Sequence, residues 1–338
     1  MFRIGVIVRN TWPIEAAVEY AKRAEALGYS SVWVNSLPSS RDPFVTLAAI
    51  ARSTSRIRLG TAVVDVRSRH PAVLAGSIAS LYELSGGRAD LGVSPGGGGS
   101  GRATYEKLGF QMDDPVGITR ESVRIIKALL SGETVDFQGS HFKIESAVLQ
   151  ARPSRDIRVL VAAEGPRMLK VAGEVGDGLI APKGPDDFTR EILDKFLTSV
   201  AASGRKRWQV DTVMECNVAV GETPGEAVEF LRPFVAESMS HLTPPALKAL
   251  NLTMEEIAKF KSDPSRLAPE QVKQFSVCGT VDDCVTQLKD LKRMGLDEIY
   301  LWYPEFTPSS KYSIDKVRER AYMMEKVGAE LVPRASAI

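Results

Sequence analysis

The sequence predicts an α/β protein with a closed (β/α)8 TIM barrel, on three observations. Eight apolar segments with strand character alternate with segments of helical spacing along the 338 residues. Strands that alternate with helices pair in parallel through right-handed crossovers. The glycine motif of an open dinucleotide-binding sheet does not follow the first strand, and eight strands exceed the number in such a sheet. We therefore expect one barrel domain over residues 1–338, with insertions near 95–150 and 242–274.

The first part of the chain shows the clearest alternation. Runs rich in Ile, Val and Leu predict buried parallel strands, and apolar residues at helical spacing predict the helices between them. Gly28 and the pair Gly86-Gly87 are placed to stop helices, while Asp42 is placed to cap one and Pro71 suits a first helical turn. The expected strands are 2–8, 31–35, 57–64 and 89–93, and the expected helices are 14–27, 43–51 and 71–84.

After residue 93 the alternation loosens and then resumes. Residues 115–130 predict a long helix, and 134–144 predict a small hairpin with Gln138-Gly139 at its turn. Thr223 is placed to cap the helix that follows it. The remaining expected strands are 157–163, 178–181, 210–220 and 298–303, and the remaining helices are 166–175, 186–203, 224–237, 281–294 and 313–327.

The composition argues against several classes of function. A net charge of +1 provides no basic field for nucleic acid or for an acidic membrane surface. No segment is apolar for long enough to form a signal peptide or a membrane span, so we expect a cytoplasmic protein. The three cysteines and three histidines lack the spacing of metal ligands, so we expect no metal site.

In a barrel of this kind, the loops after the carboxyl ends of the strands carry the function. One such loop is a glycine-rich tract over 94–101, which lacks the Gly-Lys-Ser/Thr ending of a P-loop. Small residues such as Ser94, Gly96 and Gly97 would let a flat ring lie against the end of the strand. The alternative is a flexible loop or the hinge of a lid.

Another loop joins the strand at 157–163 directly to a helix. Gly165 frees the backbone and Pro166 suits the first helical turn, so the amides at this helix start form a natural anion site. Lys183 and Gly184, after the next strand, are placed to complete a phosphate site. The alternative is a plain turn between a strand and a helix, with an ordinary helix cap.

Candidate acids and bases are few at the expected strand ends. His70 has no base or metal partner nearby in the sequence, and we favour a histidine that bonds the backbone at a helix start. The chain has no Gly-x-Ser-x-Gly elbow and no His-Glu-x-x-His motif. An anion site with so few titratable groups indicates a cofactor that carries the chemistry itself, and we assign no catalytic residue.

Five segments, in this order along the chain, resemble the luciferase-like flavin and deazaflavin oxidoreductases. They are AAVEYAKRAEALGYSSVWV, DPFVTLAAIARSTSRIRLGTAV, HPAVLAGSIASLYELSGGRADLGV, AAEGPRMLKVAGEVGDGLI and FSVCGTVDDCVTQLKDLKRMGLDEIYL. The resemblance covers most of the chain. It implies a (β/α)8 barrel, a homodimer, a small-molecule substrate and an isoalloxazine-type ring in the mouth of the barrel.

Within this family, TAVVDVRSRHP and the tract after LGV are most similar to the branch that uses the deazaflavin coenzyme F420, in particular to methylenetetrahydromethanopterin reductase-like proteins. The resemblance implies a bulge in the third strand with a non-proline cis peptide at Ala62-Val63, behind the ring. The cofactor contacts that we expect are Asn35, Ala62, Val63, Ser94, Gly96 and Gly97 near the ring, and Ala163, Glu164, Gly165, Lys183 and Gly184 near the phosphate.

The sugar-phosphate and alcohol dehydrogenases of this branch carry Asp-His after strand two and Glu after strand four. Here those places hold Asn35-Ser36 and the glycine tract, which argues against both activities and leaves no obvious general acid. We therefore expect hydride transfer between F420 and an organic substrate. The first alternative is an FMN-dependent luciferase-like monooxygenase, and the second is a non-catalytic flavin-binding protein.

Overall fold

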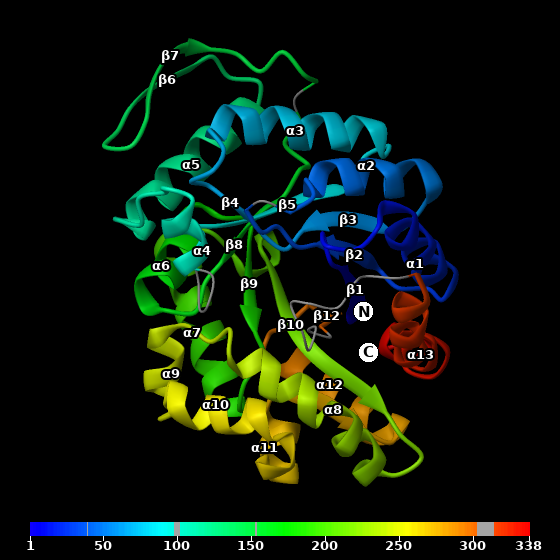
Figure 1. Cartoon of the computed structure of the whole chain (residues 1–338). Coiled ribbons are helices and arrows are strands. Elements are labelled where there is room, and N and C mark those ends of the chain that lie inside the picture. Colours follow the sequence, from blue (N-terminus) through cyan, green and yellow to red (C-terminus); the bar gives the residue numbers. More distant parts are fainter. Residues whose placement is uncertain (39, 98–101, 153, 303–313) are drawn as a thin grey trace.

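Parallel strands close into a barrel with helices around it (Figure 1). The computed structural model describes residues 1–38, 40–97, 102–152, 154–302 and 314–338, without the side chains of 314–320. Within these residues the barrel has eight strands, in the order β1, β2, β3, β5, β8, β9, β10 and β12, and β12 pairs with β1 to close the ring. The predicted (β/α)8 barrel is confirmed.

The barrel strands fall where the sequence predicted them. They are β1 (Arg3–Val8), β2 (Ser31–Val34), β3 (Arg58–Thr61), β5 (Ala89–Ser94), β8 (Val159–Ala162), β9 (Gly178–Pro182), β10 (Asp211–Val220) and β12 (Glu298–Leu301). The expected third strand, 57–64, is interrupted, and its continuation β4 (Val64–Asp65) pairs with β5. The strand β11 (Ser276–Gly279) was not predicted from the sequence; it pairs with the carboxyl end of β10.

The larger helices also agree with the expected ranges to within a few residues. They are α1 (Ile14–Ala26), α2 (Pro43–Ser53), α3 (Pro71–Leu84), α5 (Pro115–Leu130), α6 (Pro166–Val175), α7 (Asp186–Ala202), α8 (Pro224–Met239), α12 (Val281–Arg293) and α13 (Ile314–Glu330). Residue 313, the expected start of the last helix, lies outside the described residues. Two short elements were not expected, the 3-10 helix η2 (Arg207–Gln209) and the C-terminal α14 (Val332–Ala335).

Three polar residues cap helices as the sequence predicted. The Asp42 carboxylate accepts a hydrogen bond from the Phe44 amide at 2.7 Å, and the Thr223 hydroxyl accepts one from the Glu226 amide at 3.3 Å. His70 Nδ1 accepts a hydrogen bond from the Ala72 amide at 3.2 Å, at the start of α3. The favoured interpretation of His70 as a histidine that bonds the backbone is therefore confirmed.

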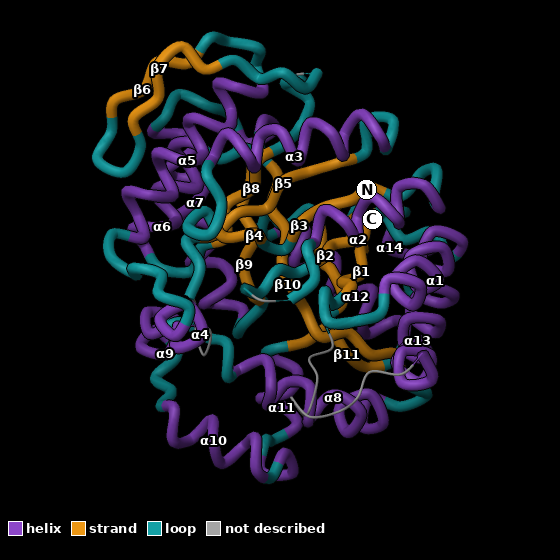
Figure 2. The backbone as a smooth tube through the Cα atoms, turned by 45° about the horizontal axis from the view of Figure 1, so that its top comes forward, coloured by secondary structure: helices purple, strands orange, loops and turns teal. Residues whose placement is uncertain are grey.

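Two insertions depart from the barrel. The first contains α4 (Arg102–Lys107) and the predicted hairpin, now β6 (Val135–Gln138) and β7 (Lys143–Ala147), which projects beyond α3 and α5 in both views (Figures 1 and 2). Its loop spans the four residues 139–142, so the connection is longer than the two-residue turn expected. The second insertion contains α9 (Pro244–Ala249), α10 (Met254–Ser262), η3 (Pro264–Arg266) and α11 (Pro269–Gln274).

The inside of the barrel is filled by side chains from its strands. Ile7, Trp33, Leu160, Val213 and Tyr300 belong to one buried apolar cluster inside the ring. The Trp33 ring occupies the space that a side chain at residue 60 would need, since a Cβ there would lie 2.4 Å from it. The strand residues between these positions pack outward against the helices.

Arginines and carboxylates alternate around the amino end of the barrel, where the strands begin. Asp90 accepts hydrogen bonds from Arg58 and Arg158, and Arg158 also pairs with Asp211. Arg3 then joins Asp211 to Glu298, a carboxylate that is 2 % exposed. Each of these buried or half-buried carboxylates thus has at least one arginine partner. Such a partner offsets the free energy that is lost when a charge is removed from water.

Candidate functional site

The carboxyl ends of the barrel strands form the other end of the lumen, and the third strand is irregular there. Gly60 pairs with Asp90 and Val64 pairs with Val93, so β3 and β4 together use one residue more than β5 over the same stretch. The peptide bond between Ala62 and Val63, inside this bulge, is cis. The bulge and the cis bond predicted from the resemblance are both confirmed, while the ring in front of them stays a prediction.

Asn35 follows β2 and is almost fully buried, at 7 % exposed. Its Oδ1 accepts a hydrogen bond from the Asn10 amide at 2.9 Å, which joins the ends of β1 and β2. The Asn10 side chain donates to the Arg41 carbonyl at 3.2 Å, while its own Oδ1 has no hydrogen-bond partner among the described residues. Asn35 therefore fixes the geometry of this rim, and its predicted contact with a cofactor is untested.

Ser94, Gly96 and Gly97 follow β5, and the rest of the tract, 98–101, lies outside the described residues. The Ser94 hydroxyl accepts a hydrogen bond from the Gly96 amide at 3.2 Å. Both glycines have φ near +70°, and a Cβ would lie 2.9 Å from the Tyr105 ring at Gly96 and 2.2 Å from the Met112 side chain at Gly97. Packing within the chain is thus sufficient to require glycine at both positions, and clearance for a ring stays a prediction.

The predicted phosphate site at the start of α6 is covered by the second insertion. Gly165 is the N-cap of α6 and has no side-chain cap, and Pro166 is the first helical residue. A Cβ at Gly165 would lie 3.3 Å from Pro245 of α9. The Glu164 carboxylate accepts hydrogen bonds from the Thr243 amide at 3.1 Å and from its hydroxyl at 2.7 Å. These contacts place α9 directly against the helix start.

Lys183 and Gly184 follow β9, which lies beside β8, the strand that leads into α6. The Lys183 ammonium donates to the carbonyl of Gln274 at 2.7 Å and to that of Gly184 at 3.1 Å, and burial lowers its pKa. The Gly184 amide donates to the Thr189 hydroxyl at 3.3 Å. In this conformation the ammonium is therefore held by backbone carbonyls, and a contact with phosphate would require it to exchange one of them.

The sequence reasoning missed a carboxyl inside the lumen, that of Glu215. Val213 belongs to the interior cluster whereas Met214 and Cys216 pack outward, so the alternation along β10 turns Glu215 inward. Burial and the nearby Glu164 charge raise its pKa to about 7, against weaker opposing effects of Tyr300 and Arg9. The signal available was a lone Glu in the middle of a largely apolar strand.

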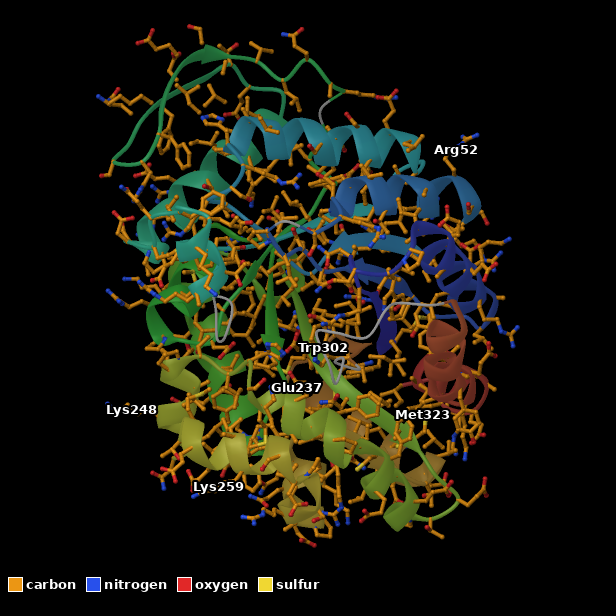
Figure 3. The ribbon with its side chains drawn as sticks, viewed as in Figure 1. Arg52, Glu237, Lys248, Lys259, Trp302 and Met323 are labelled. Atoms are coloured by element: carbon orange, nitrogen blue, oxygen red, sulfur yellow. The ribbon has the colours of Figure 1, made fainter. Side chains whose placement is uncertain are left out.

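Trp302 closes the lumen at the end of β12 and is 8 % exposed. The Arg9 guanidinium lies over its indole, 4.8 Å from the ring centroid, and the His241 ring meets it edge-on at 6.2 Å. His241 in turn lies 3.9 Å from the Glu237 carboxylate of α8, and Figure 3 labels Glu237 and Trp302 in the same part of the molecule.

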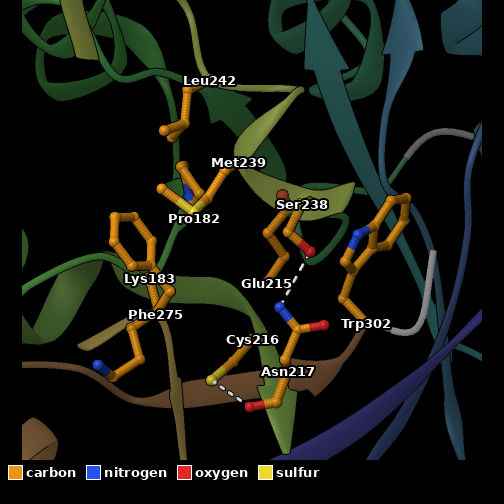
Figure 4. A pocket seen from close by; sticks show the side chains of 10 residues that line it. All are labelled: Pro182, Lys183, Glu215, Cys216, Asn217, Ser238, Met239, Leu242, Phe275 and Trp302. Carbon is orange, nitrogen blue, oxygen red and sulfur yellow. Dashed lines mark hydrogen bonds between the residues drawn. The ribbon is translucent and has the colours of Figure 1, made fainter. Parts of the chain in front are cut away.

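A small pocket, with a volume of about 20 Å³, opens between β9, β10, α8 and Trp302 (Figure 4). Lys183, Glu215, Asn217 and Ser238 are among its lining residues. The Asn217 amide donates to the Ser238 hydroxyl at 2.9 Å, which leaves Asn217 Oδ1 and Trp302 Nε1 buried without a hydrogen-bond partner among the described residues. Unpaired buried polar atoms are costly, so these groups are suited to a polar ligand.

The described residues show no helix that is long and apolar enough to cross a membrane. They also contain no group of three or more His, Cys, Asp or Glu side chains that could hold a metal ion. The three cysteines are buried and free.

The fold and the bulged third strand define a class of barrel proteins with a ligand site at the carboxyl ends of the strands. The family model for luciferase-like monooxygenases matches residues 2–298. This match covers most of the chain, which therefore belongs to the luciferase-like family.

Curated relatives of the chain include two kinds of enzyme. A 5,10-methylenetetrahydromethanopterin reductase of Methanolobus tindarius is 33% identical over 310 residues, which cover 86% of this chain and 91% of that protein. An F420-dependent glucose-6-phosphate dehydrogenase of Kineococcus radiotolerans is also 33% identical, over 306 residues that cover 80% of this chain and 85% of that protein. The two kinds are equally similar by identity.

Solved structures share the fold over the whole chain. The coenzyme F420-dependent tetrahydromethanopterin reductase from Methanopyrus kandleri has a TM-score of 0.81 at 23% identity, covering 98% of this chain and 99% of that one. A monooxygenase from Streptomyces bottropensis has a TM-score of 0.74 at 22% identity, covering 98% of this chain and 99% of that one.

Proposed function

We propose that the protein is an F420-dependent oxidoreductase that transfers a hydride between the deazaflavin and an organic substrate, as methylenetetrahydromethanopterin reductases do. The observation that carries this proposal is the similarity to relatives at 33% identity that include F420-dependent enzymes, together with the bulge at Ala62-Val63. The deazaflavin supplies the two-electron chemistry when it is bound.

The residues at the carboxyl end of the barrel fit such a group. Asn10 Oδ1, Asn217 Oδ1 and Trp302 Nε1 are buried polar atoms without hydrogen bonds among the described residues; Asn10 and Trp302 follow β1 and β12, and Asn217 lies within β10. A ring with carbonyl and N–H groups could satisfy them. The bulge at Ala62-Val63, with Asn35 and Ser94 beside it, would position the ring, and the start of α6 at Ala163, Glu164 and Gly165 would bind the phosphate.

The main contribution of the protein is then to hold two reactants in contact and to exclude water. Trp302 and α8 cover one side of the lumen, and α9 covers the start of α6. Lys183 would approach the phosphate by giving up one of its carbonyl partners. The catalytic role of any single side chain is not part of this proposal.

Three further predictions come from the resemblance and from the composition. They are a homodimer, a cytoplasmic location and a single domain over residues 1–338 with its two insertions. Light scattering of the purified protein tests the dimer, and limited proteolysis followed by unfolding of the products tests the single domain.

A titration of the purified protein with F420 and, separately, with FMN tests the proposed cofactor. We expect quenching of F420 fluorescence with saturation in the micromolar range or below, about −8 kcal/mol or tighter. FMN binding without F420 binding would overturn the choice and favour the second candidate function, a luciferase-like monooxygenase, which the matching family model supports. Tight binding without turnover of any acceptor would favour a flavin-binding protein.

The phosphate site can be tested separately with Gly165→Val. The branched side chain would crowd Pro245 and the helix start, and we expect the affinity for either phosphate-bearing cofactor to fall at least about tenfold. Gly225→Val is a control, because Gly225, like Gly165, lies next to the first proline of a helix, here α8, and a Cβ there meets nothing closer than 3.9 Å. Unchanged affinity in Gly165→Val would remove this site from the proposal.

A further inference from the structure

β10 places Glu215 on the side of the lumen that faces the bulge. In the closed order of eight strands, β10 lies four strands from β3 in either direction, so the two strands are opposite each other. A ring that rests against Ala62-Val63 would turn its free face toward β10. The Glu215 carboxyl and the pocket beside it therefore lie where a substrate would meet that face (Figure 4).

The surroundings of Glu215 favour a carboxyl that keeps its proton. The Tyr300 hydroxyl of β12 donates to Glu215 Oε2 at 3.3 Å, which is long for such a bond. The charged groups around it are Glu164 after β8 and Arg9 after β1. Lys183, after β9, lines the same pocket, and His241, after α8, lies against Trp302. Arg9 lies over the Trp302 indole and Lys183 is held by carbonyls.

Glu164 is less suited to deliver a proton to a substrate. Two donors of Thr243 already bind its Oε2, and α9 covers this side chain. Among the described residues, the Glu215 carboxyl has only the long Tyr300 bond, and it lines the pocket beside two polar atoms without a partner there, Asn217 Oδ1 and Trp302 Nε1. Those atoms could orient the polar end of a substrate next to the carboxyl.

We propose that Glu215 is a catalytic acid that protonates the substrate as it receives the hydride, and that the substrate is therefore a neutral carbonyl, imine or conjugated alkene. This inference rests on the proposed function, because it requires a reduced deazaflavin in the lumen. A substrate that is already cationic would need no such acid. The sequence around Glu215 did not by itself indicate this role.

The step balances in atoms and charge. The hydride brings two electrons to the acceptor carbon, and the π electrons of the C=O, C=N or C=C bond move to the far atom. That atom takes the proton from the Glu215 carboxyl, which becomes a carboxylate. The reduced deazaflavin gives up one hydride and one proton in becoming oxidised, and that proton restores the carboxyl. The substrate thus gains two electrons and two protons in total.

Infrared difference spectroscopy between pH 5 and pH 9 tests the acid without any substrate. We expect a carboxyl C=O band that titrates near neutral pH, disappears in Glu215→Gln and shifts when F420 is added. Glu237→Gln is the matched control, because this nearby carboxylate of α8 is paired with Lys261 and the Gln variant should leave the band in place. A Glu215 carboxyl that titrates below pH 5, or that does not respond to bound F420, overturns the inference.

Reduction of acceptors by reduced F420 then tests the substrate class. We expect Glu215→Gln to lower kcat for neutral acceptors such as cyclohex-2-enone or methylglyoxal by about 100-fold or more, and Glu215→Asp to restore part of it. The affinity for F420 should stay within about threefold of wild type. Equal rates of the wild type and Glu215→Gln with every acceptor, or turnover of methylenetetrahydromethanopterin alone, would overturn the inference.

The proposed function can fail independently of this inference. Loss of F420 binding in the wild type would overturn the function itself. If F420 binds and the wild type reduces none of these acceptors, the infrared response of Glu215 to the bound cofactor decides the inference.

Discussion

The two ends of the barrel bury carboxyl groups in opposite ways. At the amino end, Asp90, Asp211 and Glu298 each pair with one or two arginines. At the carboxyl end, Glu164 has two donors from Thr243, and Glu215 has one long bond from a tyrosine. Arginines thus neutralise the carboxylates at the amino end of the barrel, whereas the carboxyls at the carboxyl end are bonded by hydroxyl and amide groups.

The consequence is visible in the direction of the pKa shifts. Burial tends to raise the pKa of Asp90, but hydrogen bonds and charges from Arg158 and Arg58 overcome it and hold that pKa below its usual range. Burial and the Glu164 charge raise the pKa of Glu215 to about 7, and the opposing effects of Tyr300 and Arg9 are too weak to reverse this rise. Perturbed carboxyls of the second kind are typical of reactive sites, and fully paired ones are typical of stabilising networks.

Removing one carboxylate at the amino end should have the largest effect. Asp90→Ala leaves Arg58 and Arg158 without their shared partner, and we expect a loss of about 3–5 kcal/mol in the free energy of unfolding. Urea unfolding followed by circular dichroism measures it. Asp282→Ala, which removes an exposed partner of Arg334, is the control and should change stability little. Equal effects of both variants would contradict the paired network.

At the carboxyl end, we expect the free energy of unfolding to depend on pH through Glu215. The pKa of Glu215 is higher in the folded protein than the ordinary glutamate value of 4.5, so its contribution to stability is complete below pH 4.5 and is lost as the pH rises through about 7. Glu215→Gln should therefore gain about 2–3 kcal/mol relative to wild type between pH 5 and pH 8. The contribution of Asp90 should stay constant over this range, because its lowered pKa makes it fall only in acid. Urea unfolding at each pH measures the difference, and parallel pH profiles of the two proteins would refute it.

The smallest effect should come from the contact of Thr243, at the start of α9, with Glu164, just before α6. Thr243→Val removes the hydroxyl that donates to Glu164 at 2.7 Å, and we expect a loss of about 1 kcal/mol in stability. Thr286→Val is the control, because its hydroxyl bonds only the Asp282 carbonyl within α12 at an exposed position. Thermal unfolding of both variants provides the measurement. A larger loss of stability in the control than in Thr243→Val would argue against a stabilising bond between Thr243 and Glu164.

Local patterns were sufficient for the barrel and for most of its helices. The caps Asp42, His70 and Thr223 follow from side chains that accept bonds from amides two or three residues away, which the sequence shows directly. The strand β11 was missed because it consists of four residues beside a polar insertion, and its pairing partner β10 lies about 60 residues earlier. A short strand of this kind is stabilised by its neighbours more than by its own pattern.

In the candidate site, too, local features were predicted and contacts between distant residues were not. The bulge at Ala62-Val63 and the helix start at Gly165 were predicted, the first by resemblance and the second by local chemistry. The contacts of Pro245 and Thr243 with that helix start were not, because they bring together residues about 80 positions apart. The orientation of the Lys183 ammonium toward Gln274 has the same cause.

The sequence by itself determined the eight strands, their parallel order and the end of the barrel that carries the site, because these depend on periodicity and on the direction of the chain. Only the tertiary structure decided which carboxyls are paired. Arg58, Arg158 and Asp90 meet because three strands start at the same end of the barrel. Glu215 stays unpaired by any arginine hydrogen bond among the described residues because its place in β10 faces a lumen of apolar and aromatic side chains. Charge neutralisation depends on distances across the barrel, and one strand's sequence does not contain them.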